Sequence, residues 1–177
     1  THVPMHSVAV DSSRFISDGE PIVIKISFND PGNERNFYTV KIIEDAFYLT
    51  GKMVNNVIKW DTLWYTQEVY FEVVNQSLTS DETGLEKLIN DSHFNGKEYT
   101  FHLKLHNRYI YGPKIVPRNT RLILLSITEE YYRYFSTKIL QESKSYDPFA
   151  QPVQVFTNIE NGLGIFAGYS ASVIELK

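Results

Sequence analysis

The chain has 177 residues, a formal net charge of −4, a hydrophobic fraction of 42% and no cysteine. This length predicts a single domain over residues 1–177 that can bury a sizeable core. The mild, mixed charge disfavours nucleic-acid binding, which usually needs a basic patch. The absence of cysteine excludes disulfides and thiolate chemistry in these residues. No apolar run approaches the ~20 residues that cross a bilayer, so we expect the chain itself to be soluble.

Two-residue alternation of apolar and polar residues predicts that most of the chain is β-structure. The alternation is clear over residues 22–28 and 37–43, and Pro31 and Gly32 between them supply backbone angles that suit a turn. We therefore expect these two strands to form an antiparallel pair. The strongest alternation, over residues 98–106, puts large side chains on one face, namely Tyr99, Phe101, Leu103 and Leu105.

Further short segments suit strands because apolar residues lie between clusters of Gly, Pro and Asn. These segments are residues 69–74, 121–127, 153–156 and 172–176. Many short strands separated by turn residues are typical of antiparallel sheets packed face to face. The sequence therefore predicts a mostly β protein, an antiparallel β-sandwich with one packed α-helix in its C-terminal half.

The segment over residues 129–142 changes to helical spacing. Its apolar face consists of Tyr131, Tyr132, Phe135 and Ile139. Glu129 suits the positive end of the helix dipole, and Ser126, three residues earlier, fits a capping box. We expect this helix to pack on the sheet. A second, shorter helix over residues 82–88 is a weaker prediction, because Gly84 has a low helix propensity.

Histidines and acidic pairs are the candidate catalytic or metal-binding groups. His102 and His106 would lie about 13 Å apart along the predicted strand, too far apart to bind one metal ion, so we expect both to be surface residues. The pair Asp81–Glu82 is better explained as a helix start or loop, and Glu129–Glu130 as charges at the positive end of a helix dipole, than as glycosidase or metal sites. No nucleophile-elbow motif occurs. We therefore predict that the protein is not an enzyme and uses no metal and no cofactor.

Three glycines near the C-terminus, Gly162, Gly164 and Gly168, could suggest a phosphate loop. A phosphate loop needs a following helix and a basic residue, and no Lys or Arg follows before Lys177. Glycine also permits positive φ and close backbone approach, so we expect a tight bend here. Neighbouring apolar side chains are expected to anchor this bend to the core, namely Leu163, Ile165 and Phe166.

The segment from residue 47 to 70 leaves the most room for function, because it is aromatic without clear periodicity. Both tryptophans of the chain, Trp60 and Trp64, lie here beside Tyr65. If their rings are exposed, they can stack on a sugar or anchor a protein interface. The alternative is that they cover an open side of the sandwich. A second candidate binding surface, the loop over residues 107–119, combines aromatic and cationic groups: Tyr109, Tyr111, Lys114 and Arg118.

The last third of the chain combines a tyrosine-rich helix with the motifs DPFA (residues 147–150) and NIE (residues 158–160) and with three glycines. Two inner motifs accompany them, FNDPGNE (residues 28–34) and DSHFNGKEY (residues 91–99). This combination resembles an uncharacterised family of Bacteroidetes outer-membrane lipoproteins, domain of unknown function 4249, usually encoded beside a TonB-dependent receptor. Members of that family are typically longer and carry a lipidated cysteine. The resemblance therefore implies the C-terminal part of a longer lipoprotein.

The resemblance also implies a location and a partner. The full-length protein would be lipid-anchored at the outer membrane or cell surface, with a TonB-dependent receptor as its partner. We therefore expect a non-catalytic binding or assembly module in nutrient capture or uptake. The alternative is a domain that binds glycans directly through exposed aromatic residues. A hydrolase that acts on glycans or peptides is the third interpretation.

Overall fold

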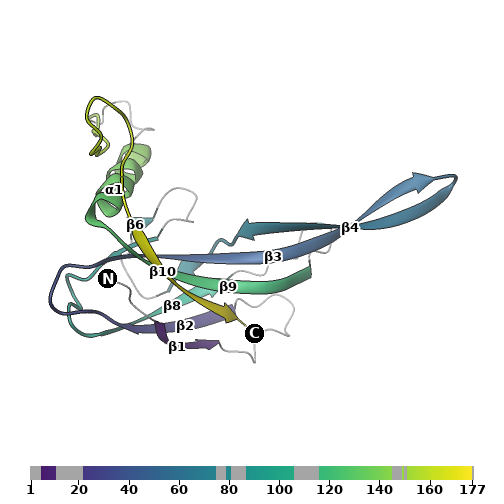
Figure 1. Ribbon diagram of the computed structural model, residues 1–177, viewed down its shortest axis with the longest axis horizontal. Helices are drawn as coiled ribbons and strands as arrows, with labels where there is room; N and C mark the ends of the chain where they lie inside the picture. The colour runs from purple at the N-terminus through teal and green to yellow at the C-terminus, as the bar shows by residue number, and fades with distance from the viewer. Residues whose placement is uncertain are drawn as a thin grey trace.

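The computed structural model describes residues 5–10, 22–74, 79–80, 87–105, 116–144, 149 and 151–176, which form two antiparallel sheets and one helix (Figure 1). Sheet A has the strand order β1-β2-β8-β5, made of β1 (Met5–Val10), β2 (Ile22–Asn29), β8 (Glu98–Leu105) and β5 (Glu72–Val73). Sheet B has the order β10-β9-β3-β7-β6, made of β10 (Tyr169–Leu176), β9 (Val116–Ile127), β3 (Phe37–Val54), β7 (Lys87–Asn90) and β6 (Thr79–Ser80). Strand β4 (Val57–Glu68) pairs with β3, and helix α1 (Glu129–Lys144) follows β9. The predicted mostly β fold with one helix is confirmed.

The main core lies between the two sheets. Strands β2 and β8 pair over their whole length, and alternate residues of both point toward sheet B. Phe28 and Phe101 are fully buried there, with ring centroids 6.4 Å apart in an edge-to-face arrangement. Sheet B contributes alternate residues of β3 and β9, including Tyr38, Ile42 and Leu122. The period of two in the sequence therefore reflects strands with one buried face.

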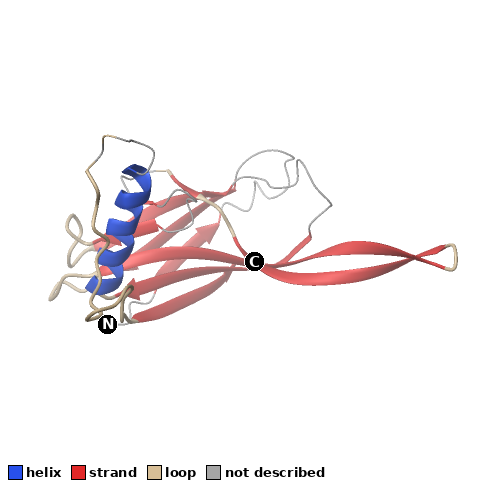
Figure 2. Cartoon of the chain, turned by 90° about the horizontal axis from the view of Figure 1, so that it is seen from above, coloured by secondary structure: helices blue, strands red, loops and turns tan. Residues whose placement is uncertain are grey.

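Helix α1 forms a third layer on the other face of sheet B (Figure 2). Ile139 is buried, and the aromatic residues Tyr131, Tyr132 and Phe135 are half-buried against the sheet. The helix begins after Thr128, whose carbonyl accepts a hydrogen bond from the Tyr132 N–H at 3.1 Å. Hydrogen bonds from its own backbone N–H and from the Thr128 side chain lower the pKa of Glu130. Ser126 is not the helix cap that the sequence suggested, because it is still paired within β9.

Strands β2 and β3 do not form the antiparallel pair that the turn between them suggested. They belong to different sheets, and the chain crosses from sheet A to sheet B between them. Asp30 is buried at this corner and accepts hydrogen bonds from the Tyr38 hydroxyl and from the Gly96 N–H. A Cβ on Gly32 would lie 2.8 Å from the Gly96 Cα, so the two backbones touch. The buried polar groups of this turn are therefore hydrogen-bonded in a side-chain network rather than between two paired strands.

Three local predictions need correction. Residues 153–156 form no strand, because they run beside α1, where the Phe156 N–H donates to the Thr137 hydroxyl at 2.9 Å. Within residues 69–74, only the two residues of β5 are a strand. The short helix predicted over residues 82–88 ends in β7 instead, and its first part lies outside the described residues.

Candidate functional site

Strands β3 and β4 continue as a two-stranded hairpin beyond the two sheets (Figure 1). Phe47, opposite Val116, is the last residue of β3 that pairs with β9. From Tyr48 onward, β3 pairs with β4 alone among the described strands. We call residues 47–64 the arm. At ~3.4 Å per residue, its unsupported part reaches about 24 Å past the sheet.

A two-residue turn closes the arm. Asn55 and Asn56 have φ angles of 53° and 59°. Both central residues of a type I′ hairpin turn need such positive φ angles, which asparagine tolerates better than most side chains. From the turn back to the pair of Phe47 and Trp64, the strands pair without a register shift. This register determines which side chains share a face of the arm.

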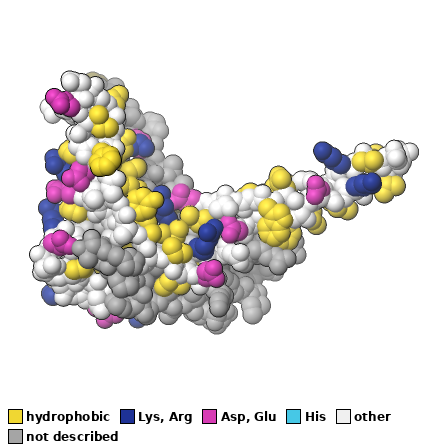
Figure 3. Space-filling view, in the orientation of Figure 1, with side chains coloured by type: hydrophobic (Ala, Val, Ile, Leu, Met, Phe, Trp, Pro, Cys, Tyr) yellow, Lys and Arg dark blue, Asp and Glu magenta, His cyan; other side chains and the backbone are white. Residues whose placement is uncertain are grey.

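The outer face of the arm continues the face of sheet B that carries α1. Paired residues lie on the same face of a sheet, so Trp64 beside Phe47 and Trp60 beside Gly51 both lie on this outer face. Trp60 is 67% exposed and Trp64 is 57% exposed. The other large exposed side chains on this face are Leu49, Met53 and Ile58. We call these residues the outer stripe, and Figure 3 shows apolar side chains spread along the arm.

Gly51 determines how Trp60 lies on the outer face. A Cβ at Gly51 would be 3.2 Å from Cζ3 of Trp60 and 3.0 Å from Cγ2 of Ile58. The indole therefore leans across the arm and over the Gly51 backbone, where an added side chain would press against it. The ring turns away from the open edge of β4 and presents its exposed surface outward.

The inner face of the arm is also apolar, but charged residues interrupt it. Tyr48 and Tyr65 are half-buried at its base, with ring centroids 5.9 Å apart. Lys52 lies directly opposite Lys59 nearer the turn. The large exposed apolar residues on this face are Val54, Val57 and Leu63. Both faces of the arm therefore expose apolar side chains, unlike the faces of the packed sheets.

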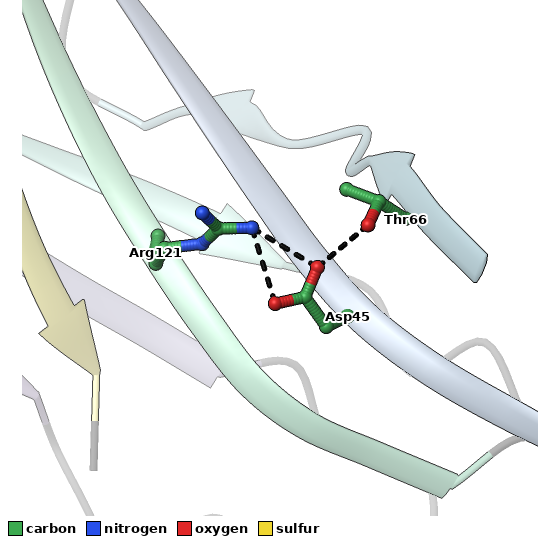
Figure 4. Close-up of polar contacts among 3 residues, drawn as sticks. All are labelled: Asp45, Thr66 and Arg121. Carbon is green, nitrogen blue, oxygen red and sulfur yellow. Dashed lines mark hydrogen bonds and ion pairs between the residues drawn. The ribbon is translucent and has the colours of Figure 1, made fainter. Parts of the chain in front are cut away.

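A polar cluster fixes the arm to sheet B at its base (Figure 4). Nη2 of Arg121 donates to both carboxylate oxygens of Asp45, at 3.0 and 3.1 Å. The Thr66 hydroxyl donates to the same carboxylate at 2.7 Å. These contacts join β9, β3 and β4 where the pairing of β3 with β9 shifts register, between Asp45 and Ala46. Because these hydrogen bonds link three strands, they fix the orientation of the arm relative to sheet B.

The residues predicted to bind from sequence have different places in the structure. Trp60 and Trp64 lie on the outer stripe, and Tyr65 lies at the base of the arm. Trp60 does not cover an open side of the sandwich, because it lies on the unsupported part of the arm, whereas Trp64 lies at the base of the arm beside Phe47, the last β3 residue that pairs with β9. Arg118 belongs to β9, but its side chain is outside the described part of the chain. The remaining two predicted residues also lie outside the described residues: Tyr109 and Tyr111.

The sequence prediction missed Leu49, Met53 and Ile58, which complete the outer stripe. It also missed β4 itself. The available signal was the dipeptide Asn55–Asn56 between two apolar segments, which is typical of a two-residue hairpin turn.

A second exposed apolar surface lies in the loop between α1 and β10. The Asn158 side chain bonds both the N–H and the carbonyl of Phe166, each at 2.8 Å. The Thr157 hydroxyl donates to the carbonyl of Gly164 at 2.7 Å, and Gly164 has the positive φ of 102° that a tight bend needs. Leu163 is 95% exposed and Phe166 is 85% exposed, so the prediction that they anchor the bend to the core is wrong. Polar side chains hold this loop instead.

An open cleft of about 410 Å³ lies where the β2–β3 connection meets the starts of α1 and β10. Glu34 and Glu129 line it, and both are exposed to solvent, unlike the desolvated carboxyl groups that act as catalytic acids. Within the described residues, no three or more His, Asp or Glu side chains are grouped so that they could hold a metal ion. Helix α1, the one helix in the described residues, is not long and apolar enough to cross a membrane.

A family model described as a domain of unknown function (DUF4249) matches residues 1–175. The chain belongs to this family. The sequence resemblance to domain of unknown function 4249 is thereby confirmed. Comparison with curated proteins and with solved structures found no significant match.

The motifs that resemble the DUF4249 family build the framework of the fold. The inner motifs, residues 28–34 and 91–99, meet at the corner between the sheets, where buried Asp91 accepts a hydrogen bond from the Asn36 N–H at 2.6 Å. The C-terminal motif supplies Asn158, which holds the loop before β10. Family membership therefore accounts for these structural positions and assigns no ligand to the arm.

Proposed function

We propose that this domain is a non-catalytic binding module whose arm docks into a groove of a partner protein. The partner we propose is a TonB-dependent receptor, and the role is nutrient capture or uptake. We further propose that a longer, lipid-anchored form of the protein works at the cell surface. The family resemblance supports the receptor and the location, and the arm supports the docking mode.

The observation that carries this proposal is the apolar surface on both faces of the arm. The exposed residues are Leu49, Met53, Val54, Val57, Ile58, Trp60, Leu63 and Trp64. At roughly 150 to 250 Å² for a large side chain, their exposed fractions amount to about 900 Å². One partner of a standard-size interface buries about 800 Å². A groove that encloses both faces of the arm accounts for this surface, because exposed apolar patches of several hundred Å² mark interaction sites.

Direct glycan binding is the second candidate, because the indole of Trp60 lies over Gly51 and is largely exposed. Trp60 and Trp64 share one face at about 13 Å along the strand, so they could contact two units of one sugar chain. This interpretation leaves the exposed residues of the inner face, such as Val57 and Leu63, without a role. We rank the protein partner first because it accounts for both faces.

A pull-down from outer-membrane extract tests the proposal. The full lipidated protein is compared with a double variant, Met53→Glu with Ile58→Glu, which puts charges on two exposed positions of the outer stripe. We expect the native protein to recover a TonB-dependent receptor and the double variant to lose it, because an apolar groove rejects unpaired charges. Leu163→Glu with Phe166→Glu is the control, since it also charges two exposed apolar positions, in a loop away from the arm.

Two results would change the assignment. Unchanged receptor recovery by the double variant would exclude the arm as the docking element. Loss of retention on a glycan array by Trp60→Ala, with normal unfolding and with receptor recovery abolished by soluble glycans, would favour the glycan-binding candidate.

A further inference from the structure

The open edge of β4 is a second feature of the arm, separate from its faces. Among the described strands, β4 pairs with β3 on one side and with no strand on the other. We propose that this edge pairs antiparallel with the same edge of a second copy, about a twofold axis that passes midway between Trp60 of the two copies. This proposal does not rest on the docking function, because the dimer uses the edge of β4 and the docking uses the faces of the arm.

The edge is unusually suited to strand addition. Native edge strands are commonly short or protected by proline, bulges or several lysines. Strand β4 has 12 residues, VIKWDTLWYTQE, which include no proline or glycine and a single lysine, and its pairing with β3 has no bulge. In a two-residue hairpin the pair next to the turn, here Val54 with Val57, is hydrogen-bonded. Non-hydrogen-bonded and hydrogen-bonded pairs then alternate along the arm. The backbone N–H and C=O groups of Ile58, Trp60, Thr62 and Trp64 therefore point toward the open edge.

Charge complementarity selects the register of this dimer. A twofold axis normal to the sheet keeps each residue on its own face, so the axis passes midway between one residue of β4 and the same residue of the second copy. We name each possible axis by this residue. If that residue is Trp60, Lys59 of each copy lies directly opposite Asp61 of the other, and two ion pairs form. An axis through Lys59 or through Asp61 instead sets two like charges opposite each other. An axis through Thr62 puts Asp61 opposite Leu63 and leaves both charges unpaired.

The charged residues are available for these pairs. Lys59 faces Lys52 across the arm, so its nearest cross-strand neighbour repels it. Asp61 is exposed, and its carboxylate accepts a hydrogen bond at 2.8 Å from the Thr62 N–H, which is one of the donors at the open edge. In the dimer this carboxylate would turn to Lys59 of the second copy and release the Thr62 N–H to pair with Ile58 of that copy. In the dimer, each lysine would gain an opposite charge directly across the new strand pair.

The side chain on the axis also fits. Two tryptophans at a twofold axis would obstruct strand pairing if their rings projected over the open edge. Gly51 removes this obstacle, because the Trp60 indole leans the other way, to 3.2 Å from a Cβ position on Gly51. The dimer converts two isolated hairpins, each marginal as a two-stranded unit, into one four-stranded ribbon. The outer stripes of the two copies then lie on the same face of this ribbon.

Cysteine cross-linking tests the register directly, because the chain contains no cysteine. Lys59→Cys and Asp61→Cys are made as separate variants, mixed, and oxidised with oxidised glutathione. In the proposed register the two positions form a non-hydrogen-bonded pair with Cα atoms about 4.5 Å apart, within disulfide range. Each variant alone should cross-link poorly, since identical residues are offset by two positions and lie beyond about 7 Å. Thr62→Cys alone is the control for the alternative axis.

Charge exchange tests the energetics in sedimentation equilibrium over a concentration series. Lys59→Asp or Asp61→Lys alone should weaken dimerisation roughly ten-fold, because two symmetry-related pairs change from attraction to repulsion. The double variant with both changes should recover the native dimer, since the charges are again complementary. A native protein that stays monomeric, a dimer that does not respond to charge reversal, or efficient cross-linking of Thr62→Cys alone would overturn the proposal. None of these outcomes depends on whether the arm binds a receptor.

Discussion

The two halves of β3 carry similar side chains in different surroundings. Residues 37–46 have neighbouring strands on both sides over most of their length and lie within the packed layers, whereas residues 47–54 have β4 alone beyond Phe47. Ile42 is fully buried, but Val54, twelve positions further along the same strand and on the same face, is 40% exposed. Residue type therefore does not decide burial along this strand. The number of neighbouring elements decides it.

This difference separates two uses of apolar residues. In the sandwich, an apolar side chain stabilises the fold because folding removes it from water. On the arm, folding leaves the same kind of side chain in water, so only a second molecule can bury it. Substitutions in the sandwich should thus lower the free energy of unfolding, and substitutions on the arm should affect binding.

The largest effect is expected at Phe28 in the sandwich. Its ring is fully buried among the rings of Tyr38, Phe94, Tyr99 and Phe101. Phe28→Ala should lower the free energy of unfolding by about 3 to 5 kcal/mol, measured by denaturant titration. Phe166→Ala is the matched control, because its ring is exposed and should change stability little. An equal loss in the free energy of unfolding for both variants would show that buried and exposed apolar side chains do not differ in this way.

The sequence predicted those parts of the fold in which one face is buried and the other is not. Strands β2 and β8 alternate because one face of each packs against sheet B, and α1 shows helical spacing because one side covers the sheet. Strand β4 gave no such signal. Its apolar residues occupy both faces, for example Val57 and Ile58, so no period of two appears.

The tertiary arrangement could not be read from local signals. The turn after β2 contains good hairpin residues, yet Asp30 is buried in a network with Tyr38 and Gly96, and the chain changes sheet there. The tryptophans were recognised as candidate binding residues by their type. Their position on an arm depends on where β9 stops pairing with β3, which is a property of three strands together.

A smaller loss is expected where α1 packs on sheet B. Ile139 is buried between helix and sheet, and the next residue, Leu140, is 45% exposed. Ile139→Ala should lower the free energy of unfolding by about 2 to 4 kcal/mol, whereas Leu140→Ala should change it by under about 1 kcal/mol. Alanine has the highest helix propensity, so neither substitution weakens the helix itself. The difference between the two variants in denaturant titration therefore reports the packing of the helix on the sheet. Similar losses at the two positions would show that the helix faces the sheet differently.

Tyr38 joins the core to the polar corner and gives a pH-dependent effect. Burial, and then its hydrogen bond to Asp30, raise the pKa of Tyr38 above its ordinary value of 10.0. Above that pH the unfolded chain loses the proton while the folded chain keeps it, so stability should fall as pH rises from about 10. Tyr38→Phe should reduce this fall, and at neutral pH it should cost about 1 to 2 kcal/mol because Asp30 loses a donor.

The control for this effect is Tyr169→Phe, since Tyr169 is largely exposed. Its unfolding curves should follow the native protein across the alkaline range. An alkaline fall that is unchanged in Tyr38→Phe would assign the titration to another group, such as Tyr99, whose pKa is also raised by burial.

The smallest effect on stability is expected at Trp60, although tryptophan is the largest side chain. Its indole lies over Gly51 of the arm, it is not among the residues that pack on the sandwich core, and 67% of its surface is exposed. Trp60→Ala should therefore change the free energy of unfolding by less than about 0.5 kcal/mol, the usual range for surface substitutions. The measurement is made at a protein concentration low enough to keep the chain monomeric, so that dimer dissociation does not contribute. A loss above about 1 kcal/mol would mean that the outer stripe stabilises the fold itself, and the apolar surface of the arm would then no longer require a partner.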